Sequence, residues 1–168
     1  MKNTQKYDSY KEAFKLMKQA VDNQELPTSI AAIAITESII ADRCYSFLHY
    51  KENRFIMEKK SRNEFIKTSV LVDRCGKYFK NHPEKVNQKD GNVLSTTSLF
   101  PEVKEWLKKR NSCLHGFAKS EPKTPTMSVD DFKRFAIETS KEGYKYATLI
   151  KKWHKNELEK NRKLGISL

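Results

Sequence analysis

The sequence predicts an all-α protein, a single domain of about five helices in an up-and-down bundle with one long loop. Three observations predict this fold class. The 168 residues include only five Gly and five Pro, too few turn residues for a protein of many short strands. Apolar residues recur every three or four positions, which is the spacing of one helical face. The length is ordinary for one domain, so residues 1–168 need no second core.

Two helices are expected in the first third of the chain. Between Tyr7 and Asn23 the apolar side chains keep helical spacing, which predicts the first helix. Pro27 and Thr28 then precede a second helix over residues 29–51. So many of its positions are apolar that most of the segment is expected to be buried. This second helix is therefore expected to be the central one.

The middle of the chain is more charged. Residues 51–63, KENRFIMEKKSRN, can continue the second helix, form a turn or contact nucleic acid, and the sequence leaves these interpretations open. A third helix is predicted from Asn63 to about Phe79, with Phe65 on its apolar face. Residues 81–98 contain an Asp-Gly turn pair and few apolar side chains, so they are expected to form the one long loop.

The fourth and fifth helices follow this loop. Ser98 or Phe100 is expected to cap the fourth helix, with Pro101 in its first turn, where a missing N–H does no harm. Ser128 and Asp131 resemble a capping box at the start of the fifth helix. The apolar stripe of that helix continues to Trp153, and the last residues of the chain are expected to be frayed and basic.

The chain is strongly basic, with 33 Lys and Arg against 21 Asp and Glu and a formal net charge of +12. Such a charge attracts polyanions, so nucleic acid is the first partner to consider, ahead of an anionic membrane. Solubility is the alternative explanation, because lysine-rich helical faces are common. The basic residues continue into a tail over residues 155–168.

No membrane segment or export signal is predicted. The N-terminus is polar, and the longest apolar run, Ile30 to Ile35, is far short of the roughly 18 residues that a membrane span requires. The cysteines Cys44, Cys75 and Cys113 lie too far apart in sequence to suggest a zinc site or a redox pair. We therefore expect a soluble cytoplasmic protein with buried thiols and with no metal or other cofactor.

One constellation suggests chemistry, the segment RNSCLH that begins at Arg110. Asn111 and His115 are four residues apart, so a helix places them within about 40° of each other on one face. Arg110 lies about 140° round the axis from His115, so a straight helix aims it elsewhere. Its long side chain can return toward the same site, or a second subunit can close the gap.

These residue types suit RNA cleavage by the neighbouring 2′-hydroxyl. Imidazole titrates near neutral pH, so His115 can act as general base or acid. The guanidinium of Arg110 matches the oxygens of the scissile phosphate, and Asn111 can hold the phosphate or orient the histidine. Carboxylate clusters suited to a two-metal nuclease are missing near the motif, which favours a metal-independent reaction.

The segment RNSCLH resembles the R-x4-6-H signature of HEPN ribonucleases, including the polar residue directly after the arginine that active members carry. The resemblance implies a helical bundle that forms a homodimer, in which two Arg-Asn-His sets face one cleft and cut RNA without a metal. Arg110, Asn111 and His115 would then be catalytic. Members of this family often serve as toxins of toxin–antitoxin pairs or as phage-defence effectors, so an antitoxin or regulatory protein is an implied partner.

The residue two positions after His115 departs from one branch of the family. HEPN toxins that are silenced by nucleotidyltransferase antitoxins resemble R-x4-H-x-Y, whereas this chain has Phe117 at the tyrosine position. A phenyl ring has no hydroxyl that could accept AMP. AMPylation at this position is therefore excluded.

Other charged side chains have two interpretations each. Four lysines near the motif either follow an RNA backbone or form an ordinary solvated face. They are Lys104, Lys108, Lys109 and Lys119. Glu37 is a lone carboxylate in an apolar helix, and pairing with Arg110 or Arg43 is favoured over a catalytic role.

The remaining aromatic and histidine side chains are expected to be structural. Trp106 and Trp153 have helical spacing and are predicted core residues rather than base-stacking platforms. His49, His82 and His154 have no acidic or cysteine partner at a useful spacing, so each is expected at the surface. Two other functions stay open: a catalytically silent HEPN-like bundle that binds RNA or protein, and a basic helical regulator of nucleic acid.

Overall fold

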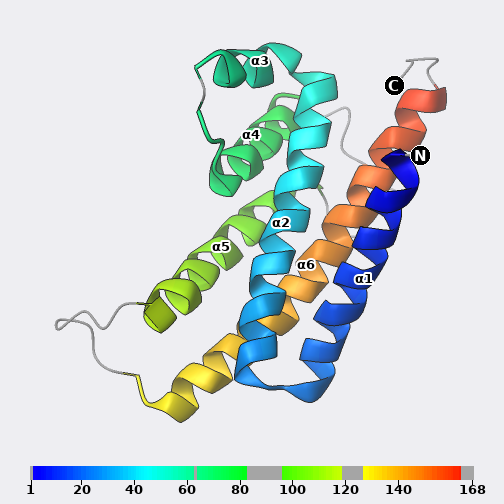
Figure 1. Ribbon diagram of the computed structural model, residues 1–168. Coiled ribbons are helices and arrows are strands. Elements are labelled where there is room, and N and C mark those ends of the chain that lie inside the picture. The colour runs from blue at the N-terminus through cyan, green and yellow to red at the C-terminus, as the bar shows by residue number, and fades with distance from the viewer. Residues whose placement is uncertain (1, 63, 83–95, 119–126, 164–168) are drawn as a thin grey trace. The chain divides into compact units, whose positions relative to one another are not determined.

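The computed structural model of the chain describes residues 2–62, 64–82, 96–118 and 127–163. This part of the chain forms six helices (Figure 1). They are α1 Lys2–Asn23, α2 Leu26–Lys51, α3 Asn53–Ser61, α4 Thr68–Asn81, α5 Thr96–Ala118 and α6 Val129–Lys163.

The chain divides into two compact units, each built from segments that are distant in the sequence. Unit 1 contains Met1–Glu37 and Trp106–Lys145, and unit 2 contains Ser38–Glu105 and Tyr146–Leu168. The borders fall inside α2, α5 and α6, so each of these helices contributes residues to both units. The expectation of a single domain stays a prediction.

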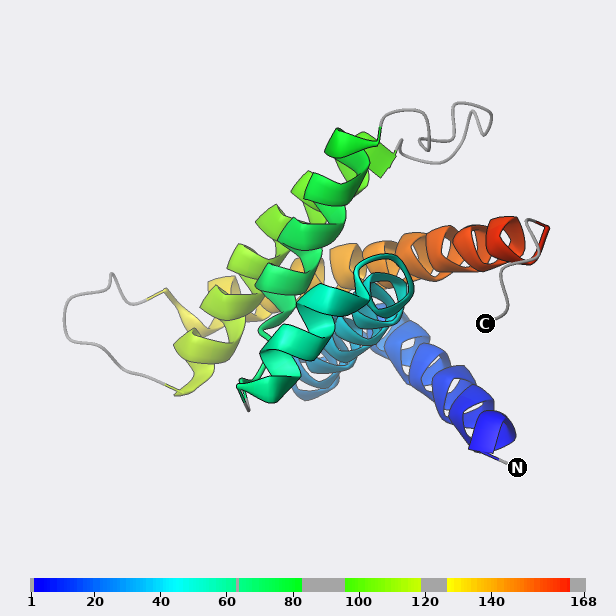
Figure 2. The same ribbon diagram turned by 90° about the horizontal axis from the view of Figure 1, so that it is seen from above.

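Aromatic rings form the core of unit 2. Phe47 of α2, Phe79 of α4, Phe100 of α5 and Trp153 of α6 are all buried. The ring centroids of Phe47 and Trp153 lie 4.9 Å apart, and those of Phe100 and Trp153 lie 5.0 Å apart. Phe79 stacks on Phe100 where α4 runs beside the unit 2 part of α5 (Figure 2). The predicted core role of Trp153 is therefore confirmed.

His154 is also buried in unit 2, so the prediction of a surface histidine was wrong. Its exposed fraction is 4%, although Lys152 and Lys155 beside it are exposed. The prediction relied on the charged neighbours in the sequence, but the helical face decides burial. His154 follows the fully buried Ile150 by one turn and therefore lies on the buried stripe of α6.

Two elements of unit 2 differ from the predicted boundaries. The charged segment 51–63 contains the short helix α3, which raises the number of described helices to six and is anchored by the buried Ile56. Helix α4 begins at Thr68 instead of Asn63, because Lys67 has an extended backbone with φ −60° and ψ 143°. Phe65 consequently lies before the helix, where its side chain is 89% exposed.

The starts of α5 and α6 show one wrong and one correct prediction. Helix α5 begins at Thr96, ahead of the caps predicted from the sequence, so Pro101 lies in its second turn rather than its first. There the missing N–H removes a helical hydrogen bond. Ser128 caps α6 as predicted, since the N–H of Asp131 donates to its hydroxyl over 3.1 Å, but the Asp131 carboxylate accepts from that hydroxyl over 2.6 Å in place of the backbone N–H of a full capping box.

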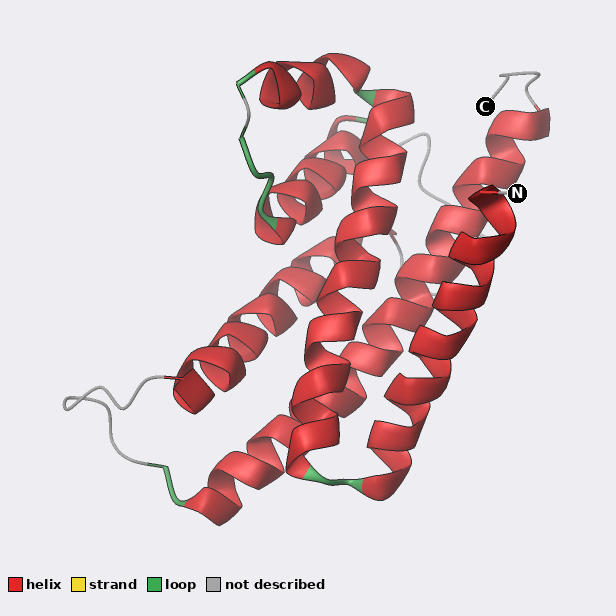
Figure 3. Ribbon diagram, viewed as in Figure 1, coloured by secondary structure: helices red, strands yellow, loops and turns green. Residues whose placement is uncertain are grey.

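Every described element is a helix or a loop, so the all-α fold class is confirmed for this part of the chain (Figure 3). None of the described helices is long and apolar enough to cross a membrane. Residues 83–95 of the predicted long loop lie outside the described residues, as do 119–126 and the end of the basic tail, 164–168.

Unit 1 begins with a hairpin of α1 and the first part of α2. Gln24 ends α1 in a left-handed conformation, φ 54°, and its N–H donates to the carbonyl of Ala20 over 3.1 Å. Helix α2 then starts one residue before Pro27, so this proline stands inside the first turn rather than before the helix. Inside the hairpin the hydroxyl of Thr36 donates to the sulfur of Met17 over 3.2 Å, and both side chains are fully buried.

Helix α6 approaches this hairpin very closely at Gly143. A Cβ atom there would lie 2.9 Å from Cζ2 of Trp106 and 3.1 Å from Oγ1 of Thr36, so a glycine is needed for this approach. The indole N–H of Trp106 donates to the carbonyl of Thr139 over 2.9 Å, and the side chain is 1% exposed. The predicted core role of Trp106 is confirmed.

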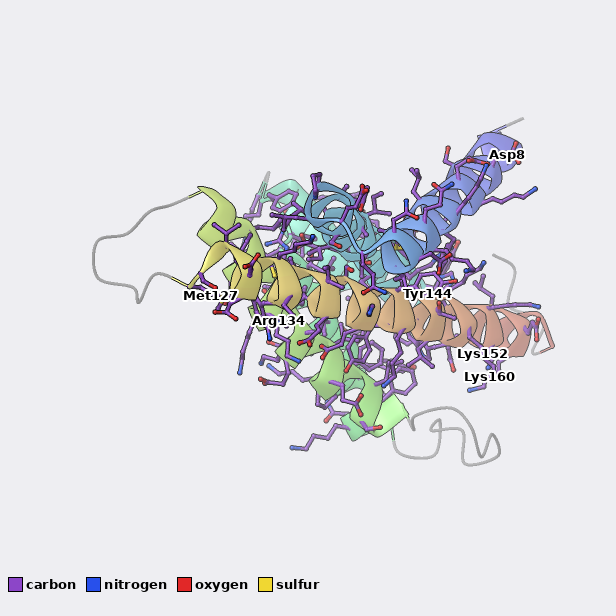
Figure 4. All side chains as sticks on the ribbon, turned by 90° about the horizontal axis from the view of Figure 1, so that it is seen from below. Asp8, Met127, Arg134, Tyr144, Lys152 and Lys160 are labelled. Atoms are coloured by element: carbon purple, nitrogen blue, oxygen red, sulfur yellow. The ribbon has the colours of Figure 1, made fainter. Side chains whose placement is uncertain are left out.

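The residue after Gly143 joins α6 to α1. Tyr144, labelled on α6 in Figure 4, meets Phe14 edge-on, with 6.3 Å between the ring centroids. Together with the contacts of Trp106 and Thr36, this pair connects all four helices that contribute to unit 1. The second half of α5 therefore packs against the other helices of unit 1.

Candidate active site

The motif residues occupy the second half of α5, within unit 1. Asn111 and His115 are exposed, whereas Cys113 between them is fully buried. Residues four apart share a helical face, and a residue two positions from each lies on the other side. Asn111 and His115 therefore stand on one accessible face of α5, as their spacing predicts.

Arg110 makes two hydrogen bonds, one to Glu37 on α2 and one to its neighbour Asn111 on α5. One Nη group donates to the carboxylate of Glu37, and the other donates to Oδ1 of Asn111 over 2.6 Å. The side chains of Arg110 and Glu37 are 22% and 20% exposed, so the ion pair is largely buried. Arg110 and Asn111 are thus brought together even though neighbouring residues on a helix point in different directions.

Glu37 reaches the site from the unit 1 part of α2. It follows Thr36, whose buried side chain packs inside the hairpin, so the carboxylate lies at the edge of the core. The expectation that Glu37 pairs with an arginine is confirmed, and the partner is Arg110. A carboxylate at this position needs such a partner, because an isolated buried charge is costly.

His115 is the accessible member of the set. No hydrogen bond or ion pair joins its imidazole to another residue in the part of the chain that the structure describes. The side chain is exposed, so a substrate can reach it. The structure therefore brings Arg110 and Asn111 into contact and leaves His115 about one turn further along the same helix.

Two of the flanking lysines are engaged with carboxylates. Within unit 1, Lys109 donates to both oxygens of Glu142 on α6 over 2.7 and 2.9 Å. Within unit 2, Lys104 pairs with Asp73 on α4 over 2.8 Å, and this hydrogen bond raises the pKa of Lys104. Lys108 is exposed. Two of the lysines near the motif are therefore neutralised by carboxylates of the same chain, in ion pairs at the surface.

Two predictions for this segment concern side chains outside the described residues. Lys119 follows the end of α5, and the side chain of Phe117 is likewise not described. The proposed contact of Lys119 with RNA and the absence of an AMP acceptor at Phe117 stay predictions.

Glu142, Asp73 and Gly143 were not predicted to matter for the site. The pairing of Lys109 with Glu142 spans 33 positions and depends on how α5 packs on α6, so the sequence carries no local signal for it. Gly143 did carry a signal. A glycine inside a helical pattern costs stability and often marks a close approach of another element.

The cysteines and the groups of metal-ligating side chains were the last features on which the sequence made a prediction. Among the described residues, no group of three or more His, Cys, Asp or Glu side chains is placed to hold a metal ion. Cys44, Cys75 and Cys113 are buried free thiols, as predicted. Burial raises the pKa of Cys113 and holds the pKa of Cys75 well above its ordinary value.

No protein-family model, curated protein or solved structure matches this chain. The chemistry of the site is therefore judged from its own geometry. That geometry offers a guanidinium fixed by Glu37, an amide bonded to it and an accessible imidazole, all within unit 1.

Proposed function

We propose that this chain is a metal-independent endoribonuclease of the HEPN type, which cuts RNA with the neighbouring 2′-hydroxyl as nucleophile. Arg110, Asn111 and His115 are its catalytic residues. The observation that carries the proposal is the arrangement on α5, where an accessible imidazole stands about one turn from Asn111, whose Oδ1 accepts a hydrogen bond from the Arg110 guanidinium. Phosphate binding and proton transfer, the two requirements of this reaction, are available together.

The proposed reaction proceeds in one displacement at phosphorus. His115 takes the proton of the 2′-hydroxyl, and the 2′-oxygen forms a bond to phosphorus while the bond to the 5′-oxygen breaks. Arg110 stabilises the negative charge on the phosphate oxygens, and Asn111 orients the groups. The departing 5′-oxygen takes up a proton, so the products are a 2′,3′-cyclic phosphate and a 5′-hydroxyl.

A homodimer completes the proposed site. Arg110 donates to Glu37 and Asn111, and within the described residues it makes no hydrogen bond with His115 of the same chain. A second copy facing the same cleft supplies a second imidazole, so that one histidine removes a proton while the other returns one. Single-stranded or looped RNA is the proposed substrate, because its bases and 2′-hydroxyls are accessible.

The biological role that we propose follows from the HEPN resemblance. A cytoplasmic RNA-cutting enzyme of this type acts as a toxin or a phage-defence effector. Such an activity requires control, so an antitoxin or other regulatory protein is a proposed partner. Growth arrest by the wild-type chain, and normal growth with His115→Ala at the same protein level, is the expected result in a host cell.

A catalytically silent bundle that binds RNA or protein is the second candidate. The observation that favours it is the ion pair between Arg110 and Glu37, because an arginine already neutralised by a carboxylate can serve stability alone. The two candidates differ in one result. The silent bundle binds RNA or protein without cutting RNA, whether or not His115 is present.

Cleavage of single-stranded RNA in EDTA by purified protein tests the proposal. Wild type is expected to cut, and His115→Ala to lose at least about a hundredfold in rate with an unchanged circular dichroism spectrum. His49→Ala is the matched control, since His49 is another exposed histidine and lies on α2. Equal cutting by wild type and His115→Ala would remove His115 from the mechanism.

A further inference from the structure

The guanidinium of Arg110 has hydrogen-bonding capacity left for a ligand, and the side chain is 22% exposed. Its two Nη groups donate to Glu37 and Asn111, and each carries a second hydrogen. Nε is buried and has no hydrogen-bond partner within the described residues. A phosphate can therefore meet Arg110 at the Nη groups, next to the oxygens of Glu37 and Asn111.

The ion pair of Glu37 and Arg110 is expected to persist when a substrate binds. Both side chains are about four-fifths buried, with exposed fractions of 20% and 22%. Removing one partner of a buried ion pair lowers the ratio of folded to unfolded protein by about two to four orders of magnitude, because the other charge stays desolvated. A phosphate that replaced Glu37 on Arg110 would leave the Glu37 carboxylate without a cationic partner. Phosphate binding beside Glu37 is therefore favoured over displacement of Glu37.

We propose that Glu37 is a positioning residue of the ribonuclease site, which fixes the guanidinium of Arg110 so that its Nη groups meet the scissile phosphate. This inference rests on the proposed function. Glu37 touches Arg110 and not the reacting atoms, so its effect passes through the orientation of the arginine. The arginine then needs no rearrangement during the reaction, which is the condition under which a fixed charge stabilises a transition state best.

The packing around Glu37 supports this role. The preceding residue, Thr36, is fully buried, and its hydroxyl would lie only 3.1 Å from a Cβ atom at Gly143. Trp106 packs against the same glycine and stands one turn before Arg110 on α5. The backbones that carry Glu37 and Arg110 are therefore fixed against each other within unit 1, next to the ion pair.

Positioning and inhibition by Glu37 predict opposite effects. If Glu37 positions Arg110, a variant without the charge has a lower kcat, because the guanidinium reorients. If Glu37 instead blocks the arginine, the same variant has a lower KM and cuts faster, because the phosphate no longer competes with a carboxylate. Glu37→Asp retains the negative charge on a shorter side chain. It therefore distinguishes the effect of losing the charge from the effect of a carboxylate too short to contact Arg110.

The experiment compares Glu37→Gln, Glu37→Asp and the matched control Glu52→Gln in RNA cleavage and thermal unfolding. Glu52 pairs with Arg74 in unit 2, and its side chain is 22% exposed, close to the 20% of Glu37. Glu37→Gln is expected to lower kcat by about a hundredfold with little change in KM. Glu37→Asp is expected to recover part of that loss of kcat. Glu52→Gln is expected to keep the wild-type kcat, although its Tm falls by about as much as the Tm of Glu37→Gln.

Three results would overturn the inference. Equal kcat values for Glu37→Gln and Glu52→Gln would limit Glu37 to stability, and a faster Glu37→Gln would make it an inhibitor. A wild-type protein that does not cut RNA in EDTA would remove the proposed function and the role of Glu37 with it. In the first two cases the wild type still cuts, so failure of this inference is distinguishable from failure of the ribonuclease.

Discussion

Cys113 lies inside the proposed catalytic segment and faces away from its reactive side. It is fully buried in unit 1, while Cys75 is fully buried in unit 2 and its thiol donates to the carbonyl of Cys44 over 3.9 Å. Burial raises the pKa of both thiols, because the thiolate loses its hydration. These cysteines are therefore structural residues and not candidate nucleophiles.

The raised thiol pKa values predict a loss of stability in alkali. The unfolded chain ionises each thiol at its ordinary pKa of about 8.5, while the folded protein keeps it protonated to higher pH. The free energy of unfolding should thus be unaffected by these groups below about pH 8, and fall by up to about 1.4 kcal/mol per pH unit and thiol above pH 9.

Urea unfolding of wild type and Cys75→Ala between pH 7 and 10 measures this effect. The difference in unfolding free energy between the two proteins should shrink as the pH rises, because only the wild type has the Cys75 thiol to ionise on unfolding. A difference that stays constant over this range would show that the Cys75 pKa is ordinary.

The core position of a single residue was predictable from the sequence where it follows from the apolar pattern of one helix. The cysteines and Trp106 are core residues in the sequence pattern and in the structure. His154 was misplaced, because its lysine neighbours concealed the buried stripe to which it belongs. The partner of Glu37 was left between Arg110 and Arg43, since the choice depends on how α2 packs against α5 and not on either helix alone.

At the scale of elements, two helix-interior glycines have different surroundings. A Cβ atom at Gly143 in α6 would lie 2.9 Å from Trp106, which is closer than atoms can approach without movement. A Cβ atom at Gly76 in α4 would lie 3.3 Å from Cβ of Phe100, a milder approach that requires a shift of only a few tenths of an ångström. A comparison of alanine at the two positions therefore distinguishes the effect of helix propensity on stability from the effect of packing.

Alanine at the two glycines is expected to change stability in different directions. Each substitution gains about 1 kcal/mol of helix propensity. Gly143→Ala also overpacks the contact with Trp106 and is expected to lose about 1–2 kcal/mol net, whereas Gly76→Ala should match or exceed wild type. Urea unfolding followed by circular dichroism measures both, and equal stability of the two variants would contradict the close contact at Gly143.

The helices themselves were largely predictable from apolar spacing, and their ends were not. All five predicted helices exist in the described residues, but α4 starts later and α5 earlier than expected. Helix α3 could not be decided, because its charged segment buries only Ile56 and so has no apolar stripe. The Ser128 cap was correct, since a capping box is encoded in neighbouring residues.

At the scale of the whole molecule, we propose that the ribonuclease is a homodimer. One chain presents one His115, which makes no hydrogen bond with Arg110 in the described residues, so a site with two imidazoles needs two copies. Sedimentation equilibrium is expected to give twice the mass of one chain at the concentrations where RNA is cut. A strict monomer with full activity would refute the shared cleft.

The chemistry of the RNA ends tests the central claim most directly. Wild-type protein and His115→Ala are incubated with a single-stranded RNA in EDTA, and the termini of the products are determined by mass spectrometry. Wild type is expected to give 2′,3′-cyclic phosphate and 5′-hydroxyl ends, and His115→Ala to form them at least about a hundredfold more slowly. Products with 5′-phosphate ends, cutting by His115→Ala at the wild-type rate, or intact RNA with wild type would contradict the assignment of the Arg110, Asn111 and His115 site as a metal-independent ribonuclease.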